Sequence, residues 1–385
     1  RQMCIRDSTY RGLTREEARE RVLIDLEKGN FLEKVEDHKL MVPRGDRSNS
    51  IIEPYLTDQW FVKIGPLAEP AIAAVKDGQI NFVPKQYENL YFSFMNDIRD
   101  WCISRQQWWG HQIPAFYDES GKVFVAENEE AARRKYNIPA EIKLVQDDDV
   151  LETWFSSSLW PIATMGWPEA SKDLDTYLPS QVLITGHDII FFWVARMIMM
   201  TLNLAGKIPF RDVYIHGLVR DSEGQKMSKT KGNGLDPLDF VDGASLRELI
   251  EKRTTNLTQP QMAKKIESRT IKEFPDGIAE YGSDSLRFTF CALATTGRDV
   301  RFDVARIEGY RNFCNKLWNV AKFALSNTED FAPGETARGT EVSDPINRWI
   351  ADRTSHVIHS CREALEEYRF DLYANHIYEF AWHEY

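Results

Sequence analysis

The sequence is poor in cysteine, and this scarcity excludes two common small architectures. Five cysteines are spread over 385 residues, and no two of them form a CxxC pair. They are Cys4, Cys102, Cys291, Cys314 and Cys361. Without paired spacing, neither a disulfide framework nor a zinc-binding loop has support. We therefore expect no protein-bound zinc, and the pattern is typical of a protein in the reducing cytoplasm.

The sequence also lacks a long uncharged apolar run and an excess of positive charge. Its one candidate membrane stretch, residues 189–204, carries Arg196 at its centre. Because a charge is costly in lipid, we expect a buried helix there and no contact with a membrane. No apolar secretory segment follows the first residues. The formal net charge of −11 argues against coating of nucleic acid by bulk charge, although a local basic patch can still bind RNA.

Length and composition indicate a globular chain of two or three domains. With 385 residues, 43% of them hydrophobic and 28% charged, the chain is too long for one ordinary core and too apolar for disorder. It begins at Arg1 rather than Met, and it ends at Tyr385 inside an apolar pattern of helical spacing. We therefore expect an internal piece of a longer protein. Residues 1–8 fit no pattern.

Local signals predict several elements in the first part of the chain. Thr14 and Glu17 form a capping box, which predicts a helix over residues 14–28. Residues 38–64 have a β-like pattern broken by Pro and Gly. Residues 127–136 predict a short charged helix.

A strand–helix–strand series follows. Residues 181–184 form a short apolar run, Thr185 and Gly186 predict a tight turn, a helix is expected from about residue 188 to 204, and residues 213–216 form a second run. Two buried strands joined by a crossover helix make a βαβ unit of a parallel sheet, and ligands in such sheets bind beyond the carboxyl ends of the strands. Those ends are residues 186–188 and 216–218.

The chain after residue 245 has a helical pattern. Residues 246–273 are rich in charge, so we expect solvated helices there. Residues 283–327 and 343–385 predict long amphipathic helices, joined by a Pro/Gly/Thr-rich connection over residues 332–345.

Two familiar phosphate-binding loops are missing from the sequence. Nothing matches the P-loop pattern GxxxxGK[ST], and no dinucleotide-binding GxGxxG opens a helix. The leading candidate for phosphate binding is instead a lysine loop, residues 224–234, which contains Lys226, Lys229 and Lys231 between glycines. Glycines let the backbone approach a ligand, and lysine is a flexible point charge for phosphate oxygens. The alternative is an exposed basic turn.

Two further segments are candidates. At the first strand end, His187 can donate to a phosphate or ribose, and Asp188 can accept a substrate ammonium or simply cap the following helix. Residues 101–111 hold three tryptophans with Arg and His, a combination that either stacks nucleotide bases or forms an aromatic domain interface. Asp147 to Asp149 indicate an acidic loop rather than a metal site, so we expect no protein metal ligands.

These segments together resemble one family. KMSKT at residues 226–230 resembles the KMSKS loop of class I aminoacyl-tRNA synthetases, and its surroundings resemble the valyl-tRNA synthetase group. The same holds for WCISRQQWWGHQIPAFYD, QDDDVLETWFSSSLWP, TGHDIIFFWVARMIMM and GYRNFCNKLWNVAKF. The likeness runs from about residue 11 to the end. The family's HIGH motif and most of its editing domain are absent from this sequence. Glu152 replaces the usual Asp of the family's DTWFSS motif, a change that we expect to be tolerated. Thr230 replaces the last Ser of the KMSKS motif.

The resemblance implies an α/β fold, namely the second half of a class I Rossmann-type catalytic domain with a parallel sheet, followed by an α-helical anticodon-binding domain. It implies that residues 1–50 end the editing insertion and form the return segment. Residues 51–243 would form the catalytic half with inserted segments at about 84–150. Stem helices would occupy residues 244–308, and the anticodon-binding domain would begin at residues 309–385.

The resemblance implies a reaction and its residues. Valine and ATP would form valyl-adenylate, and the valyl group would then pass to tRNA(Val). Lys226 and Lys229 would be catalytic, holding the phosphates together with Mg²⁺. The implied ATP-binding residues are Gly186, His187, His216, Gly217, Leu218, Val219, Lys226, Met227, Ser228 and Lys229, with adenine contacted largely by backbone groups of residues 216–219. Asp188 would pair with the valine ammonium, and Trp154, Ile189 and Trp193 would wall the side-chain pocket.

The resemblance also implies partners and leaves alternatives. The chain would need the missing amino-terminal half of its protein and would be inactive alone, and the full-length protein is expected to be a monomer. The pocket would exclude isoleucine by size but would reject threonine only about a hundredfold. One alternative is a non-catalytic tRNA-binding module. Another is an isoleucyl-type ligase, against which Asp188, Ile189 and the WWGH segment argue.

Overall fold

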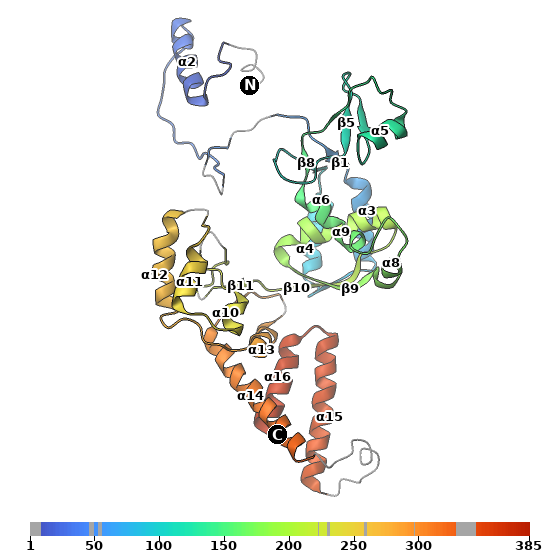
Figure 1. Cartoon of the computed structure of the whole chain (residues 1–385), viewed down its shortest axis with the longest axis vertical. Helices are drawn as coiled ribbons and strands as arrows, with labels where there is room; N and C mark the ends of the chain where they lie inside the picture. Colours follow the sequence, from blue (N-terminus) through green and yellow to red (C-terminus); the bar gives the residue numbers. More distant parts are fainter. Residues whose placement is uncertain are drawn as a thin grey trace. The chain divides into compact units, whose positions relative to one another are not determined.

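A computed structural model of the chain describes residues 9–45, 50–52, 56–221, 223–228, 232–257, 260–295, 297–328 and 344–385. The chain divides into two compact units, residues 1–60 and residues 61–385 (Figure 1).

The first unit contains one described helix, α2 (Arg15–Lys28). The predicted capping box is confirmed, since the Thr14 side chain accepts from the Glu17 N–H and the Glu17 carboxylate accepts from the Thr14 N–H at 2.8 Å. The prediction of strands over residues 38–64 is largely wrong, because the described part holds only a bridge between Arg44 and Ile51 and then the two-residue β1 (Phe61–Val62). Apolar residues in this segment are exposed rather than packed on a sheet, and Met41 is 96% exposed. A strand without a packed partner is not stable.

The second unit is built on a parallel sheet with the strand order β2-β10-β9. The strands are β2 (Asn81–Val83), β9 (Ser180–Gly186) and β10 (Phe210–His216). In register, Val213 of β10 lies between Phe82 of β2 and Leu183 of β9. The predicted βαβ unit is therefore confirmed. The sequence did not predict β2, a strand of three residues.

The crossover differs in detail from the prediction. Thr185 and Gly186 are the last residues of β9 rather than a turn. A 3₁₀ turn (His187–Ile189) and a π turn (Ile190–Val194) precede α9 (Ala195–Ala205). The Asp188 side chain does not cap this helix. Widened π turns of this kind are frequent at functional sites, and this one follows directly on the strand end.

The main core lies between the sheet and three helices, α3 (Gly65–Lys76), α4 (Tyr87–Asn96) and α9 (Figure 1). Large fully buried members include Ile80, Tyr91, Met95, Ile190, Met197, Ile198, Met199 and Ile215. Within the described residues, one stretch, His187–Ala205, is long and apolar enough to cross a membrane by length and composition alone. Its buried side chains belong to this core, as predicted for a buried helix.

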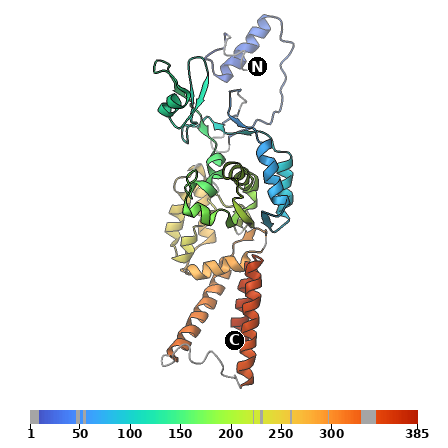
Figure 2. The ribbon, with the colours of Figure 1, turned by 90° about the vertical axis from the view of Figure 1, so that its right-hand side faces the viewer.

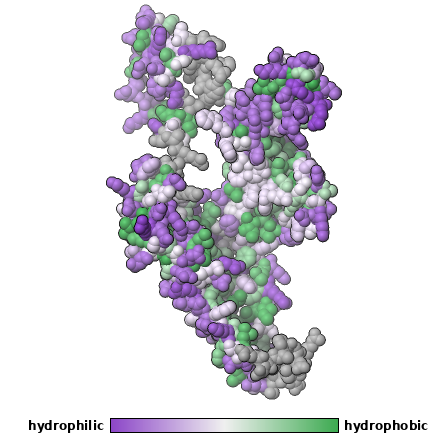
Figure 3. Space-filling model, viewed as in Figure 1, coloured by the Kyte–Doolittle hydropathy of each residue, from purple (hydrophilic) through white to green (hydrophobic). Residues whose placement is uncertain are grey.

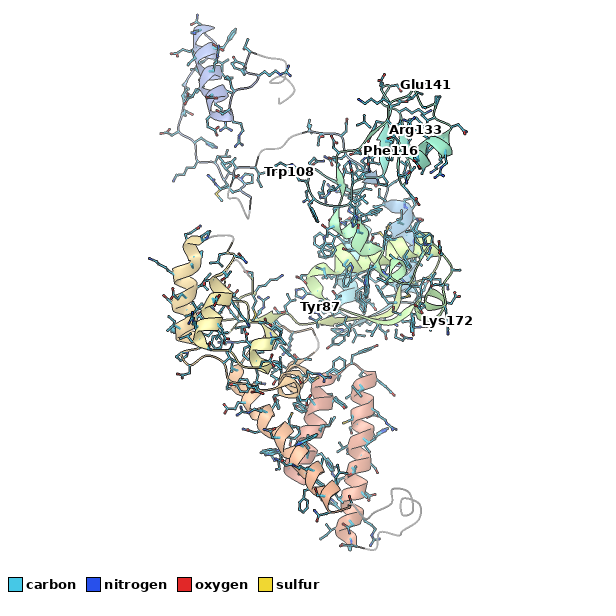
Figure 4. The ribbon with its side chains drawn as sticks, in the orientation of Figure 1. Tyr87, Trp108, Phe116, Arg133, Glu141 and Lys172 are labelled. Atoms are coloured by element: carbon cyan, nitrogen blue, oxygen red, sulfur yellow. The ribbon has the colours of Figure 1, made fainter. Side chains whose placement is uncertain are left out.

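A small subdomain lies between α4 and α6 (Thr153–Ser158). Its elements are β3 (Trp101–Cys102), β4 (Ser104–Arg105), β5 (Ala115–Tyr117), β6 (Val123–Val125), α5 (Glu129–Tyr136), β7 (Val145–Gln146) and β8 (Val150–Leu151). The predicted charged helix is confirmed as α5, with Asn128 as its N-cap. Its core is small and includes Phe116, which Figure 4 labels. The outer surface around β5 and α5 is mostly hydrophilic (Figure 3).

Two short helices, α7 (Trp160–Ala163) and α8 (Lys172–Tyr177), come between α6 and β9 in the chain, and α7 packs on α9. The elements from β11 onward form a second core and a helical end. The main ones are β11 (Val219–Arg220), α10 (Pro237–Val241), α11 (Leu246–Thr254), α12 (Ala263–Glu273), α13 (Ser283–Leu293), β12 (Val300–Arg301), α14 (Val304–Ser326), α15 (Pro345–Glu366) and α16 (Phe370–Glu379). The long helices predicted over residues 283–327 are found as α13 and α14. The prediction missed β12, which comes between them and pairs in parallel with β11. Most of the predicted connection, residues 332–343, lies outside the described residues.

The helical end is tied to the parallel sheet. Helices α15 and α16 lie side by side in Figure 1, and they overlap in the view of Figure 2. In the link between them, the Tyr368 hydroxyl donates to Asp212 Oδ2 on β10 at 2.8 Å. The Tyr368 and Phe370 rings lie 5.6 Å and 5.5 Å from the ring of Tyr214, also on β10. The link between α15 and α16 and the start of α16 therefore pack on the strand that leads to the candidate site.

Candidate functional site

The two strand ends that the sequence singled out lie side by side. His216 at the end of β10 is the register partner of Gly186 at the end of β9. Gly186 fits because it has no side chain, since a Cβ there would lie 2.7 Å from Asp188 Oδ1 and 3.2 Å from Leu218 Cδ2. Parallel strands that end together in this way leave their carboxyl ends open to a ligand.

The lysine loop reaches this edge. Lys226 Nζ donates to Asp188 Oδ2 at 2.9 Å, and both side chains remain partly exposed. The hydrogen bond from the Lys226 ammonium holds the pKa of Asp188 below its usual value. The structure therefore brings together a predicted phosphate-binding lysine and the predicted ammonium-binding carboxylate. Lys229, Thr230 and Lys231 lie outside the described residues.

His187 offers a polar atom without a partner. Its ring stacks on the Tyr87 ring with centroids 6.2 Å apart and planes 20° apart. Its Nδ1 is buried and has no hydrogen-bond partner among the described residues. Tyr87, labelled in Figure 4, is held in turn by a 3.1 Å hydrogen bond from its hydroxyl to the Gly297 carbonyl. Because buried ring nitrogens are normally satisfied, His187 Nδ1 is suited to a bound polar ligand.

A distant segment closes over the second strand end. The Leu218 N–H donates to Asp299 Oδ1 at 2.9 Å, and the Leu218 carbonyl accepts from the Val300 N–H at 2.8 Å. Burial acts to raise the pKa of Asp299, but its bonds from the Leu218 N–H and the Arg220 guanidinium keep that pKa below its usual value. Both backbone polar groups of Leu218 are thus engaged within the chain. No local pattern in the sequence points to Asp299, which lies 81 residues away from Leu218.

This closure depends on a glycine. A Cβ at Gly217 would lie 1.7 Å from the Arg298 carbonyl oxygen. We expect Gly217→Ala to push residues 298–302 away from β11 at a cost above the roughly 1–3 kcal/mol of ordinary overpacking. Hydrogen exchange of the Val300 and Phe302 amides should then speed up at least tenfold.

The control for that substitution is Gly309→Ala, since a Cβ at Gly309 in α14 meets nothing within 4 Å. We expect this change to leave the same amides protected and to stabilise α14 slightly. Equal exchange at Val300 in the Gly217→Ala chain and in its parent would contradict the close approach.

The predicted pocket residues lie on neighbouring elements, α6 and the π turn. The Trp154 ring stacks on Phe192 at 5.8 Å. Trp193 Nε1 donates to the Ser157 carbonyl at 3.1 Å. Trp154 and Trp193 are partly buried against the main core, and Ile189 is half-buried in the 3₁₀ turn. The structure thus places Trp154 on α6 and Trp193 on the π turn that contacts α6, with Ile189 in the 3₁₀ turn just before.

A buried ion pair supports this wall, and sequence reasoning missed it. Glu152 accepts from the Trp154 N–H at 3.0 Å, so it caps α6. Its carboxylate also pairs with Arg196 of α9 at 3.2 Å, with side-chain exposures of 9% and 14%. The more exposed Arg105 guanidinium lies farther from it, at 3.9 Å. The Arg196 guanidinium also lies 3.8 Å from the centroid of the Trp101 ring. Burial lowers the pKa of Arg196 to about 10, although the Glu152 carboxylate acts to raise it.

The tryptophan-rich segment splits in two. Trp101 is buried in the main core, which fits an interface role. Trp108 and Trp109 are 105% and 91% exposed, and Figure 4 labels Trp108. Base stacking by these two indoles stays a prediction. In the part of the chain that the structure describes, no three His, Cys, Asp or Glu side chains gather as a metal site would require.

Comparison with known proteins defines the class. The sequence profile of the tRNA synthetases class I (I, L, M and V) matches residues 9–303, and that of the anticodon-binding domain of tRNA ligase matches residues 347–385. The first match alone covers well over half of the chain. The chain therefore belongs to the class I tRNA synthetases, and the predicted α/β catalytic fold followed by a helical region is confirmed.

Individual relatives are more specific. The chain is 56% identical over 376 residues to a valine–tRNA ligase of Legionella pneumophila (strain Paris), and 55% identical over 378 residues to one of Coxiella burnetii. Each match covers 98% of this chain and 41% of the relative, so the chain spans about two fifths of their length.

A solved structure shows the same fold. The methionyl-tRNA synthetase of Mycobacterium tuberculosis in complex with methionyl-adenylate matches with a TM-score of 0.56 and 18% sequence identity. That match covers 88% of this chain and 53% of the other.

Proposed function

We propose that this chain supplies the second half of the catalytic domain of a valine–tRNA ligase, together with the start of its anticodon-binding domain. The observation that carries the proposal is the pairing of Lys226 with Asp188 at the ends of two parallel strands, in a chain 56% identical to a valine–tRNA ligase. The missing amino-terminal part of the protein would complete the site.

The chemistry needs positioning and charge stabilisation rather than a protein nucleophile. The valine carboxylate attacks the α-phosphorus of ATP, and pyrophosphate leaves. Lys226 and Lys229 hold the phosphates while negative charge builds on the leaving group, and Mg²⁺ carried by ATP shares that charge. The valyl group then passes from the adenylate to the terminal ribose of tRNA(Val). His187 Nδ1 is available to a phosphate or ribose oxygen. Residues 216–219 would contact the adenine through groups other than the Leu218 N–H and carbonyl, which Asp299 and Val300 already engage.

Asp188 is suited to the amino-acid ammonium because it already binds an ammonium. Its carboxylate accepts from Lys226 Nζ at 2.9 Å, and a valine ammonium has the same charge and the same donors. When valine takes that place, Lys226 is released toward the phosphates. Binding of valine therefore prepares the lysine for the reaction.

A substitution in the pocket wall should change the KM for valine and leave the KM for ATP unchanged. Trp154→Ala should raise the KM for valine about ten- to a hundredfold, because losing an apolar wall of this size costs about 1.5–3 kcal/mol of contact. The KM for ATP should not change. Trp318→Ala is the matched control, since Trp318 on α14 is 73% exposed. An unchanged KM for valine in the Trp154 variant would remove this residue from the pocket.

A hybrid enzyme tests the function. In this hybrid ligase, the present chain replaces the matching segment of the Legionella pneumophila relative, which supplies the rest of the protein. We expect ATP–pyrophosphate exchange that depends on valine, with weaker exchange for threonine and little for isoleucine. Equal or greater exchange with isoleucine would favour an isoleucyl-type ligase. Salt-dependent tRNA binding without any exchange would favour a non-catalytic tRNA-binding module.

A further inference from the structure

Two buried polar side chains lie at the base of the lysine loop. Asp221 follows β11 just before the loop, and Asn233 lies near the loop's carboxyl end. Each is 1% exposed. Polar side chains this deeply buried are normally held by several hydrogen bonds. Here the bonds run to the backbone on both sides of Met227.

The Asn233 amide bridges the two arms of the loop. Its Oδ1 accepts from the Ser228 N–H at 2.9 Å. Its Nδ2 donates to the Lys226 carbonyl at 3.3 Å and to Asp221 Oδ2 at 2.9 Å. A single side chain therefore fixes the backbone on both sides of Met227, directly beside the lysine that pairs with Asp188.

The Asp221 carboxylate braces that amide. Besides Asn233, it accepts from the N–H groups of Gln225 at 2.7 Å and Glu223 at 3.1 Å. The Arg269 guanidinium, on α12, donates to it at 2.9 Å. Burial acts to raise the pKa of Asp221, but the hydrogen bonds from Asn233, Gln225 and Arg269 outweigh it and keep that pKa below its usual value. The group is therefore a carboxylate at neutral pH.

The carboxyl end of the loop is also anchored. The Gly232 carbonyl accepts from Arg253 Nε of α11 at 2.9 Å, and Arg253 NH1 donates to Thr270 Oγ1 of α12 at 3.1 Å. Gly232 has a φ of +59°, and a Cβ there would lie 2.5 Å from Ile266 Cδ1 of α12. Helix α12 thus contacts the loop at Asp221 and at Gly232, and α11 contacts it at Gly232.

We propose that Asn233, braced by Asp221 and Arg269, is a positioning residue that aims Lys226 at the strand ends and makes the geometry of the lysine loop depend on α12. The inference rests on the proposed function. The side chain of a lysine is flexible, so the positions that its ammonium can reach depend on where its backbone is held. The bond from Asn233 Nδ2 to the Lys226 carbonyl fixes that backbone. Catalysis by positioned charge is sensitive to displacements of about 1 Å. Asn233 acts through Lys226 and contacts no substrate itself.

The first test uses exchange kinetics in the hybrid ligase. We expect Asn233→Ala to lower the kcat of valine-dependent ATP–pyrophosphate exchange about ten- to a hundredfold, with the KM for valine unchanged. Arg269→Met, which removes one brace from a less buried position, should lower that kcat several-fold. The control is Asn203→Ala, because Asn203 is exposed at the far end of α9. It should leave kcat unchanged.

The second test measures the anchoring without relying on activity. Trypsin cleavage after Lys226, Lys229 and Lys231, followed by mass spectrometry, should be faster in the Asn233→Ala and Arg269→Met hybrids than in the parent. Circular dichroism shows whether each variant is folded. If the parent hybrid showed no exchange, the proposed function would fail. The cleavage rates would still show whether Asn233 and Arg269 anchor the loop, because cleavage by trypsin needs neither ATP nor valine.

The outcomes are distinct. Slower exchange together with faster cleavage in a folded Asn233→Ala hybrid supports positioning. Unchanged cleavage overturns the proposal, whether or not exchange falls, because the loop would then not depend on Asn233. Faster cleavage with unchanged kcat also overturns it, because the anchoring would be structural only.

Discussion

Lys226→Met is expected to lower valine-dependent ATP–pyrophosphate exchange by the hybrid ligase about a hundred- to a thousandfold. Lys226 reaches the ends of β9 and β10 through its 2.9 Å contact with Asp188. Removing one preorganised donor from a developing negative charge typically has an effect of this size. Because the lost contact is to the phosphates, kcat should fall far more than the affinity for valine.

The control is Lys207→Met, since Lys207 lies exposed in the link between α9 and β10 and serves no role in the site. It should exchange at the parent rate. If Lys226→Met retained exchange within about threefold of the parent, the lysine loop would be an exposed basic turn, and the catalytic interpretation of the strand ends would fail.

Arg196→Met should cause the largest loss of stability. The substitution leaves the Glu152 carboxylate buried at 9% exposure without its nearest cation. Breaking a buried pair by removing one partner costs about 3–5 kcal/mol. The loss should be local to the contact between α6 and α9, so hydrogen exchange of the amides in these two helices is the measurement.

A surface ion pair provides the comparison. Arg287 lies 3.9 Å from Asp284, and both side chains are 82% exposed. Arg287→Met should therefore change the exchange of α13 amides by no more than about 1 kcal/mol. A similar, small effect for Arg196→Met would show that the pair with Glu152 does not hold α6 and the pocket wall in place.

Part of this site could be predicted from the sequence because its signals are local. The apolar runs at residues 181–184 and 213–216 indicated two parallel strands, and parallel strands place their carboxyl ends at one edge. That rule was enough to bring Asp188 and His216 to the same edge. The glycines and lysines of the loop after β11 carried the expectation of phosphate binding.

The remaining parts depend on partners far apart in sequence. Asp299 is 81 residues from Leu218, and Glu152 is 44 residues from Arg196. Strands β11 and β12 have only two residues each, too few for a period-two pattern. The π turn after β9 is hidden in a uniformly apolar stretch. Such contacts arise from tertiary packing, which no local pattern records.

The central claim is that this chain carries the valine-specific half of a tRNA ligase site. The most direct measurement is the complete reaction, aminoacylation of tRNA(Val) by the hybrid ligase with valine, isoleucine or threonine supplied at equal concentration. We expect stable valyl-tRNA to form, to be lost in the Lys226→Met variant and to be kept in the Lys207→Met variant. Charging with isoleucine at the valine rate, or charging that persists without Lys226, would contradict that claim.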